Sequence, residues 1–177
     1  MNTLLIRLIA LLMLAAGTSA FAAEHAPVRA VPSLDLPRYL GKWYEIAAFP
    51  MYFQRNCVGG TTAEYTLRPD GDIAVRNRCR TEDGHDEANG HAWVNDATYP
   101  AQLKVSFFWP FRSDYWIVGL DAEYRWAVVG NPNRKYLWIL SRTPVLPKPM
   151  LDAALNAAAA QGYDLGQLRY TKQEQTE

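Results

Sequence analysis

The residues of this chain that could do covalent or metal chemistry are few and widely spaced. Its three histidines, His25, His85 and His91, lack the short spacings at which two imidazoles share a metal ion. The chain also contains no Gly-x-Ser-x-Gly turn and no glycine-rich phosphate loop. These observations favour a binding protein over an enzyme, and we expect no catalytic residue, no metal site and no cofactor.

The two cysteines, Cys57 and Cys79, are the remaining reactive candidates. Pro69-Asp70-Gly71 is a turn signal between two alternating stretches, so a hairpin is predicted there, with both cysteines at the end opposite the turn. We predict a disulfide that closes a loop of roughly 20 residues and contributes about 3 kcal/mol in the chain-entropy model. The alternative is a reactive thiol, which neither a Cys-x-x-Cys motif nor a neighbouring histidine supports.

The elements that must position these residues are short strands. Eight alternating or aromatic stretches are separated by turn residues, and no long helix interrupts them. They cover residues 41–49, 61–67, 72–78, 87–94, 101–109, 115–120, 125–130 and 135–141. One of the predicted breaks contains Pro110 together with Ser113 and Asp114. The pattern predicts an all-β fold in which eight antiparallel strands close an up-and-down barrel.

One α-helix follows the last of these strands. Pro147 and Gly162 punctuate an alanine-rich run between them, as expected near the first turn and past the last turn of a helix. Residues 167–171 predict a short final strand. The apolar face of the helix, which we expect to pack on the outside of the barrel, consists of Leu151, Ala154, Leu155 and Ala158.

Barrel closure places the first and last strands of the barrel side by side. The first begins with Gly41 and Trp43, and the last ends in Arg142. We therefore expect the Arg142 guanidinium to cover the indole face of Trp43, a cation–π contact of roughly 0.5–2 kcal/mol.

Three motifs along residues 36–170 carry a family resemblance. They are Gly41-x-Trp43-Tyr44-Glu45, Leu103-Lys-Val105-Ser-Phe107-Phe108 and Tyr136-Leu-Trp138-Ile-Leu-Ser-Arg142-Thr-Pro144. Together they resemble the lipocalin family, especially the branch of bacterial outer-membrane lipocalins and apolipoprotein D. The Thr-Asp-Tyr signature of that family is degraded here, and the resemblance assigns its role to Asp121 and Tyr124. The literal Ser113-Asp114-Tyr115 falls one strand too early.

A barrel of eight strands has room for one small ligand if side chains do not fill it. Alternation puts Trp138 on one face with Arg142, and the resemblance implies that this face lines the pocket. The same alternation turns Ala63, Leu67, Val75 and Leu103 inward. The residues predicted to bind the ligand are Tyr65, Asn77, Val105, Phe107, Tyr115, Ile117, Tyr136, Trp138 and Leu140.

This predicted wall is apolar and aromatic with a few polar tips, which suits an elongated apolar molecule with one polar end. The expected function is the transport or storage of a fatty acid or lysophospholipid in the cell envelope. Three alternatives stay open at this point. They are a packed core without a cavity, a purely structural or interaction protein, and a lipocalin-fold enzyme or a protein that handles haem or another tetrapyrrole.

Four loops are expected at the open end of the barrel, those after its first, third, fifth and seventh strands. Residues 50–56 are long enough to form a partial lid. The third of these loops carries Phe108, Trp109 and Phe111, whose exposed rings would make transient contact with a membrane or with a second copy of the chain in a homodimer. An internally tucked loop is the alternative.

The N-terminal residues predict export. Residues 1–22 combine Arg7, an apolar run and a small-x-small cleavage pattern, which is typical of a secretory signal peptide. Residues 23–35 would be a mature N-terminal tail, 36–171 the barrel domain with its helix, and 172–177 a polar tail. No cysteine for a lipid anchor occurs at the cleavage point, which favours a periplasmic or secreted product, with outer-membrane association left open. The balance of 18 basic and 18 acidic residues predicts no nucleic-acid partner.

Overall fold

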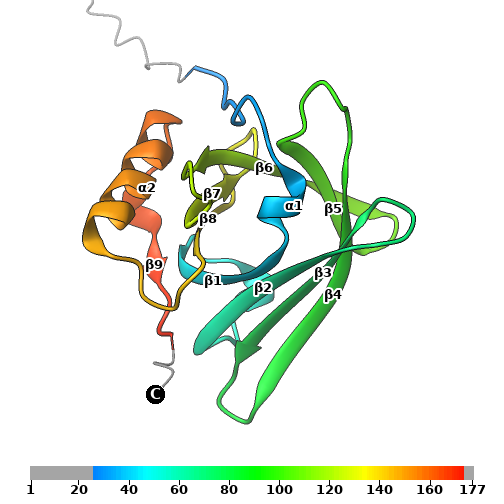
Figure 1. Cartoon of the computed structure of the whole chain (residues 1–177). Helices are drawn as coiled ribbons and strands as arrows, with labels where there is room; N and C mark the ends of the chain where they lie inside the picture. Colours follow the sequence, from blue (N-terminus) through cyan, green and yellow to red (C-terminus); the bar gives the residue numbers. More distant parts are fainter. Residues whose placement is uncertain (1–25, 174–177) are drawn as a thin grey trace, which may run out of the picture.

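The computed structural model describes residues 26–173. Nine strands form one antiparallel sheet in the order β2-β3-β4-β5-β6-β7-β8-β1-β9, and an additional pairing of β1 with β2 closes it (Figure 1). The strands are β1 (Gly41–Ala48), β2 (Gly59–Leu67), β3 (Ile73–Arg80), β4 (His85–Val94), β5 (Gln102–Phe108), β6 (Phe111–Leu120), β7 (Trp126–Gly130), β8 (Leu137–Ser141) and β9 (Arg169–Tyr170). The predicted fold, a closed eight-stranded barrel followed by one helix, is confirmed.

Alternation along the strands separates two apolar clusters. Neighbouring residues of one strand face opposite sides of the sheet, as Ile117 and Val118 do on β6. The inner cluster includes Tyr39, Trp43, Tyr65, Ile73, Val75, Leu103, Ile117, Val129 and Leu140. The outer cluster, which lies under the C-terminal helix, includes Phe49, Val118, Val128, Ile139, Ala154, Ala158 and Tyr163.

The C-terminal helix α2 (Lys148–Ala160) packs on the outside of the barrel, as predicted (Figure 1). Ala154 and Ala158 are fully buried at this contact, where their small side chains let the helix approach the sheet. Gly119 on β6 contributes to the close approach, because a Cβ atom there would lie 2.9 Å from the Cβ of Ala157. In residues 26–173, no helix is long and apolar enough to cross a membrane.

A short helix that was not anticipated closes one end of the barrel. Helix α1 (Leu36–Tyr39) begins after Asp35, whose side chain accepts a hydrogen bond from the Arg38 amide. It lies across the barrel end and places Tyr39 in the inner cluster (Figure 1). The segment before it also packs on the barrel, since Val28 is buried in the outer cluster and the Val31 amide donates to the Ile117 carbonyl.

The predicted break at Ser113 and Asp114 is wrong. Strand β6 already begins at Phe111, and only Trp109 and Pro110 connect it to β5. Asp114 is held in the strand by a 2.6 Å ion pair with Lys104, its cross-strand partner on β5. Asp114 thus lies on the outer face of a continuous strand and does not end it.

Leu67 is also misplaced by simple alternation. It occupies the last position of β2 and is 53 % exposed, because the strand runs past the packed interior at the closed end. Tyr65, two residues earlier, is the last member of this row to lie in the inner cluster.

Strand β1 changes partners along its length. Its first half pairs with β2 from Gly41 to Tyr44, and its last residues, Ala47 and Ala48, pair with β9. The chain after β9 continues between the two separating strands, where the Thr171 amide donates to the Ile46 carbonyl. The C-terminal residues therefore complete the barrel wall at the open end.

Candidate ligand-binding site

Arg142 closes the barrel from below. Its guanidinium carbon lies 3.8 Å from the centre of the Trp43 ring, so the predicted cation–π contact is present. The guanidinium also donates to the carbonyl oxygens of Lys42 (2.9 Å) and Arg38 (2.6 Å), which join β1 and α1 to the end of β8. The Trp43 indole nitrogen in turn donates to the Tyr39 carbonyl at 2.8 Å.

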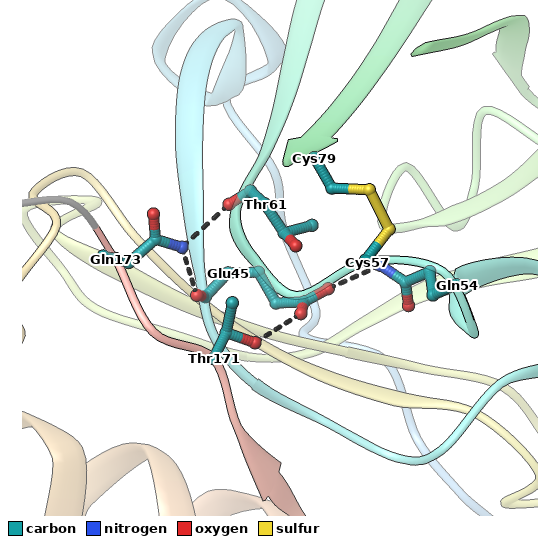
Figure 2. Close-up of a disulfide and its surroundings, with 7 residues drawn as sticks. All are labelled: Glu45, Gln54, Cys57, Thr61, Cys79, Thr171 and Gln173. Carbon is teal, nitrogen blue, oxygen red and sulfur yellow. Dashed lines mark hydrogen bonds between the residues drawn. A yellow bond between two sulfur atoms is a disulfide. The ribbon is translucent and has the colours of Figure 1, made fainter. Parts of the chain in front are cut away.

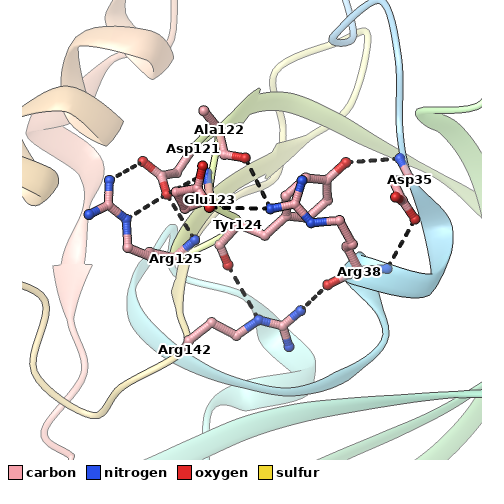
Figure 3. A network of polar contacts seen from close by, with 8 residues as sticks. All are labelled: Asp35, Arg38, Asp121, Ala122, Glu123, Tyr124, Arg125 and Arg142. Atoms are coloured by element: carbon pink, nitrogen blue, oxygen red, sulfur yellow. Dashed lines mark hydrogen bonds and ion pairs between the residues drawn. The ribbon is translucent and has the colours of Figure 1, made fainter.

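The turn between β6 and β7 completes this closed end (Figure 3). The Asp121 carboxylate accepts hydrogen bonds from the backbone and the guanidinium of Arg125, and these bonds hold the pKa of Asp121 below its ordinary value. The Tyr124 hydroxyl accepts from the Asp35 amide at 2.8 Å, and the Arg38 guanidinium lies 4.3 Å from the centre of its ring. Asp121 thus holds the turn in shape, and Tyr124 fastens it to α1.

A row of aromatic side chains rises from this closed end to the mouth. Trp138 on β8 belongs to the inner surface, and its ring stacks on Tyr136 with centroids 5.8 Å apart. Phe53 of the lid lies 6.0 Å from Tyr136. Leu140 lies below Trp138 and is buried. The lid therefore meets the barrel wall through its aromatic side chain.

Part of the inner wall is accessible to solvent. Val105, Tyr115 and Trp138 pack against the inner cluster, yet all three are only half-buried. Ile117, lower on the same wall, is fully buried. Phe107 lies nearer the mouth and is partly exposed, with its ring against the backbone of Gly90. The predicted wall residues thus range from a packed floor to an accessible upper part.

Three tyrosine hydroxyls meet at the floor. The Tyr115 hydroxyl lies 2.8 Å from that of Tyr39 and 2.7 Å from that of Tyr65. Next to them lies a small cavity of about 10 Å³, lined also by Ile73, Val75, Ala92, Leu103 and Val105. Burial raises the pKa of Tyr65 to about 12 and raises those of Tyr39 and Tyr115 well above 10, so all three remain protonated.

The three hydroxyls have three O–H donors, but only two hydrogen bonds join them. Each hydroxyl donates one proton, and two bonds join the three groups. One O–H therefore remains for an acceptor outside the trio.

Asn77 supplies an unpaired hydrogen-bond acceptor. It lies on β3 beside Ala63, and its side-chain oxygen Oδ1 is buried without a hydrogen-bond partner among residues 26–173. A buried acceptor without a donor costs about 1–3 kcal/mol, so a donor from a bound molecule would be stabilised there. The barrel wall thus offers one donor and one acceptor on an otherwise apolar surface.

The predicted disulfide joins Cys57 to Cys79. It ties the end of the lid, which contains the 3₁₀ helix η1 (Tyr52–Gln54), to β3 (Figure 2). Beside it the buried Glu45 carboxyl accepts from the Gln54 side chain at 2.8 Å and from the Thr171 hydroxyl at 2.5 Å. Lid, β1 and C-terminal segment are therefore linked at one place.

Sequence reasoning missed two residues of this arrangement, Tyr39 and Glu45. Asp35 followed by Pro37 is a helix-start signal that could have pointed to α1 and hence to Tyr39. Glu45 belongs to the first of the three motifs, but nothing local indicates its partners, which come from the lid and from the end of the chain.

The two histidines among residues 26–173 take no part in the barrel interior. His91 stacks on Trp93 with ring centroids 5.1 Å apart, on the face of β4 opposite Ala92, and His85 lies exposed at the start of that strand. His25 lies outside the described residues. Within the described chain, no group of three or more His, Cys, Asp or Glu side chains is placed to hold a metal ion.

A closed antiparallel barrel with an aromatic inner wall, a lid and a helix on its outside defines a class of small-molecule-binding proteins. Residues 34–173 match the lipocalin-like domain, and the chain belongs to the lipocalin family. Lipocalins bind small hydrophobic ligands.

Several bacterial relatives are similar over nearly their whole length. The outer membrane lipoprotein Blc of Escherichia coli K12 is 40% identical over 170 residues, which cover 91% of this chain and 96% of that protein. Blc of Vibrio cholerae is 41% identical over 150 residues, covering 83% and 87%. Bovine apolipoprotein D is 35% identical over 133 residues, covering 70% and 67%.

Solved structures share the fold at lower identity. Insecticyanin from the tobacco hornworm Manduca sexta superposes with a TM-score of 0.68 at 22% identity, covering 86% of this chain and 87% of that one. Lobster apocrustacyanin A1 gives 0.65 at 19% identity, covering 80% and 81%. These likenesses agree with the closed barrel and its external helix.

Proposed function

We propose that the protein is a carrier or store, not an enzyme, and that it holds a fatty acid or a lysophospholipid inside the barrel. The observation that supports this most is the inner wall, where half-buried Val105, Tyr115 and Trp138 leave apolar surface accessible. The spare tyrosine proton and the unpaired Asn77 oxygen would orient the polar part of such a molecule.

The proposed place of action is the cell envelope. The relatives named outer membrane lipoprotein Blc support this, and residues 1–22 have the pattern of a signal peptide. We propose a periplasmic or secreted product that begins at Ala23 after cleavage. The intact mass of protein isolated from the envelope tests the cleavage point and reveals any attached lipid.

The ligand is tested with a fluorescent fatty acid and its displacement by lysophospholipid, after delipidation of the protein. Trp138→Ala should weaken binding about tenfold or more, because it removes the largest ring of the accessible wall. Trp93→Ala is the matched control, since that ring lies on the outer face of β4. If neither lipid binds the delipidated protein, the proposed function is wrong.

A further inference from the structure

A second pocket lies outside the barrel, where β1 and β2 separate. Strand β2 pairs with β1 only as far as Tyr44, and the lid and the C-terminal segment form the two sides of the gap beyond. Between them is a cavity of about 500 Å³, called here the fork pocket. Residues 48–52, 54, 55 and 57–59 line one side and residues 169–172 the other, with Glu45 and Thr61 between them.

Glu45 holds the two sides of the fork pocket together. One carboxyl oxygen accepts from Gln54 on the lid side, and the other accepts from Thr171 on the C-terminal side (Figure 2). The Gln173 side chain adds a second link, since it donates to the backbone carbonyls of Glu45 and Thr61. The pocket is thus built by long-range contacts rather than by one loose loop.

Three cations line the fork pocket: Arg55, Arg169 and Lys172. None of them forms an ion pair with any residue in 26–173, whereas Lys104, Arg125 and Lys148 elsewhere on the surface are paired. Glu45 is the one acidic residue among those that line it, and both of its oxygens are already bonded. The three cations outnumber this one carboxyl, so the pocket has an excess of positive charge.

Apolar surface accompanies this charge. Tyr52 and Tyr170 line the pocket from opposite sides and are largely exposed, and Val58 between them is partly exposed. The Arg55 guanidinium lies 4.0 Å from the centre of the Tyr52 ring, which holds this cation over the lid. A ligand that fits must combine an anionic group with an apolar part.

We propose that the fork pocket is a second binding site, which takes an amphiphile with an anionic phosphate or carboxylate head. Arg55, Arg169 and Lys172 bind the head, and the tyrosine rings and Val58 contact the start of the alkyl chain. The volume matches that of sites for small organic ligands, which is about 300–1,000 Å³. Occupation of the site would tie the lid to the C-terminal segment from outside.

The fork pocket is separate from the proposed binding site inside the barrel. None of the residues that line the fork pocket belongs to the wall around Tyr115 and Trp138. The lid residues Tyr52 and Phe53 connect the two sites, because Tyr52 lines the fork pocket and Phe53 lies against Tyr136 at the mouth. A test of one site can therefore succeed while the other fails.

The test is a titration of full-length mature protein with hexyl phosphate, followed by backbone amide NMR. We expect the largest shifts in residues 52–59 and 169–172. The variant Arg55→Gln/Arg169→Gln/Lys172→Gln should bind about tenfold more weakly, because charge-assisted hydrogen bonds to the head are lost. Trp138→Ala should leave this binding unchanged.

A charge-matched control variant is Arg29→Gln/Arg112→Gln/Lys135→Gln, which removes three exposed cations elsewhere. It should bind hexyl phosphate like the wild type. If both triple variants bind hexyl phosphate equally weakly, the effect is non-specific electrostatic attraction, and the proposed site is wrong. Equal binding of hexyltrimethylammonium would overturn the head assignment, and equal binding of inorganic phosphate would overturn the apolar part. Shifts confined to the barrel wall would also overturn the proposal.

Discussion

The Arg142 side chain joins three elements that meet only after folding. It stacks on Trp43 of β1, and it donates to the carbonyl oxygens of Arg38 on α1 and of Lys42. Its position at the closed end is far from the mouth residues Phe53 and Tyr136. A structural role follows, in which the cation holds the floor and leaves ligand selection to the wall above.

We expect Arg142→Ala to lower the free energy of unfolding by about 1–3 kcal/mol, because it removes the cation–π contact and the hydrogen bonds to the carbonyls of Lys42 and Arg38. Urea denaturation followed by far-UV circular dichroism measures this. Arg125→Ala, on the neighbouring turn, is the control and should have a smaller effect, since that guanidinium is exposed. A wild-type midpoint combined with altered lipid selectivity would reverse the assignment.

Glu45 makes the free energy of unfolding depend on pH. Burial raises the pKa of its carboxyl, and the hydrogen bonds from Thr171 and Gln54 offset this only in part. A carboxyl whose pKa is raised by folding binds its proton more tightly in the folded state. Its stabilising contribution is therefore complete below the ordinary value of 4.5 and is lost as the pH rises through the raised pKa.

The variant Glu45→Gln resembles the protonated carboxyl at every pH. We expect its free energy of unfolding, relative to wild type, to increase as the pH rises from about 4.5, the ordinary carboxyl value. Denaturation curves at several pH values, with Glu82→Gln on an exposed loop as the control, measure this difference. A constant difference across that range would show that the Glu45 carboxyl does not titrate differently on folding.

At the scale of elements, the lid is held at two points, the last residue of its 3₁₀ helix and the cysteine that follows it. The Cys57–Cys79 bridge fixes its far end to β3, and Gln54 is tied to Glu45 on β1. The ring of Phe53, directly before these anchors, lies against Tyr136 at the mouth. Movement of the lid therefore depends on the bridge more than on the length of the loop.

Reduction of the bridge, or Cys57→Ser/Cys79→Ser, should lower the free energy of unfolding by about 3 kcal/mol, because the unfolded chain regains a loop of 22 residues. It should also speed the release of a fluorescent fatty acid, since the lid loses one anchor. Stopped-flow displacement measures the release rate, and non-reducing peptide mapping confirms the bridge in native protein. The barrel should still fold, because the Trp43–Arg142 contact is independent of it.

The strand pattern was predictable because the two faces of each strand meet different surroundings. The period of two on β8 correctly put Trp138 and Leu140 on the inner face, because the sheet there has a packed outer side under α2. The same rule failed for Leu67, which lies beyond the packed region. It also could not foresee Glu45, whose partners come from distant parts of the chain. Local sequence patterns indicate which face of a strand a residue occupies, whereas the partners of its polar groups depend on how the barrel closes.

For the whole molecule, the two ends of the barrel have different surfaces. Phe108, Trp109 and Phe111 are 79%, 74% and 74% exposed on the β5–β6 connection at the open end. The predicted apolar tip is thus exposed, and the alternative of a tucked loop is wrong. We propose that it contacts a membrane or a second copy of the chain, as the sequence suggests.

We expect Phe108→Thr/Trp109→Thr/Phe111→Thr to lose the membrane or self-association of the wild type while it retains lipid binding. Threonine keeps the strand propensity of this hairpin. Sedimentation alone and with phosphatidylethanolamine vesicles distinguishes the two partners. Leu67→Thr/Tyr99→Ser, two exposed apolar residues elsewhere, is the control. A wild type that neither dimerises nor binds vesicles would contradict the prediction.

The completion of the barrel wall by Thr171 and Gln173 has a consequence for assembly. Thr171 follows its partner Glu45 by 126 residues. Until that segment docks, the upper edge of β1 is an unpaired strand, the kind of surface at which chains aggregate. A chain truncated before residue 169 should therefore aggregate or depend on a chaperone, and docking of residues 169–173 ends that dependence in the full chain.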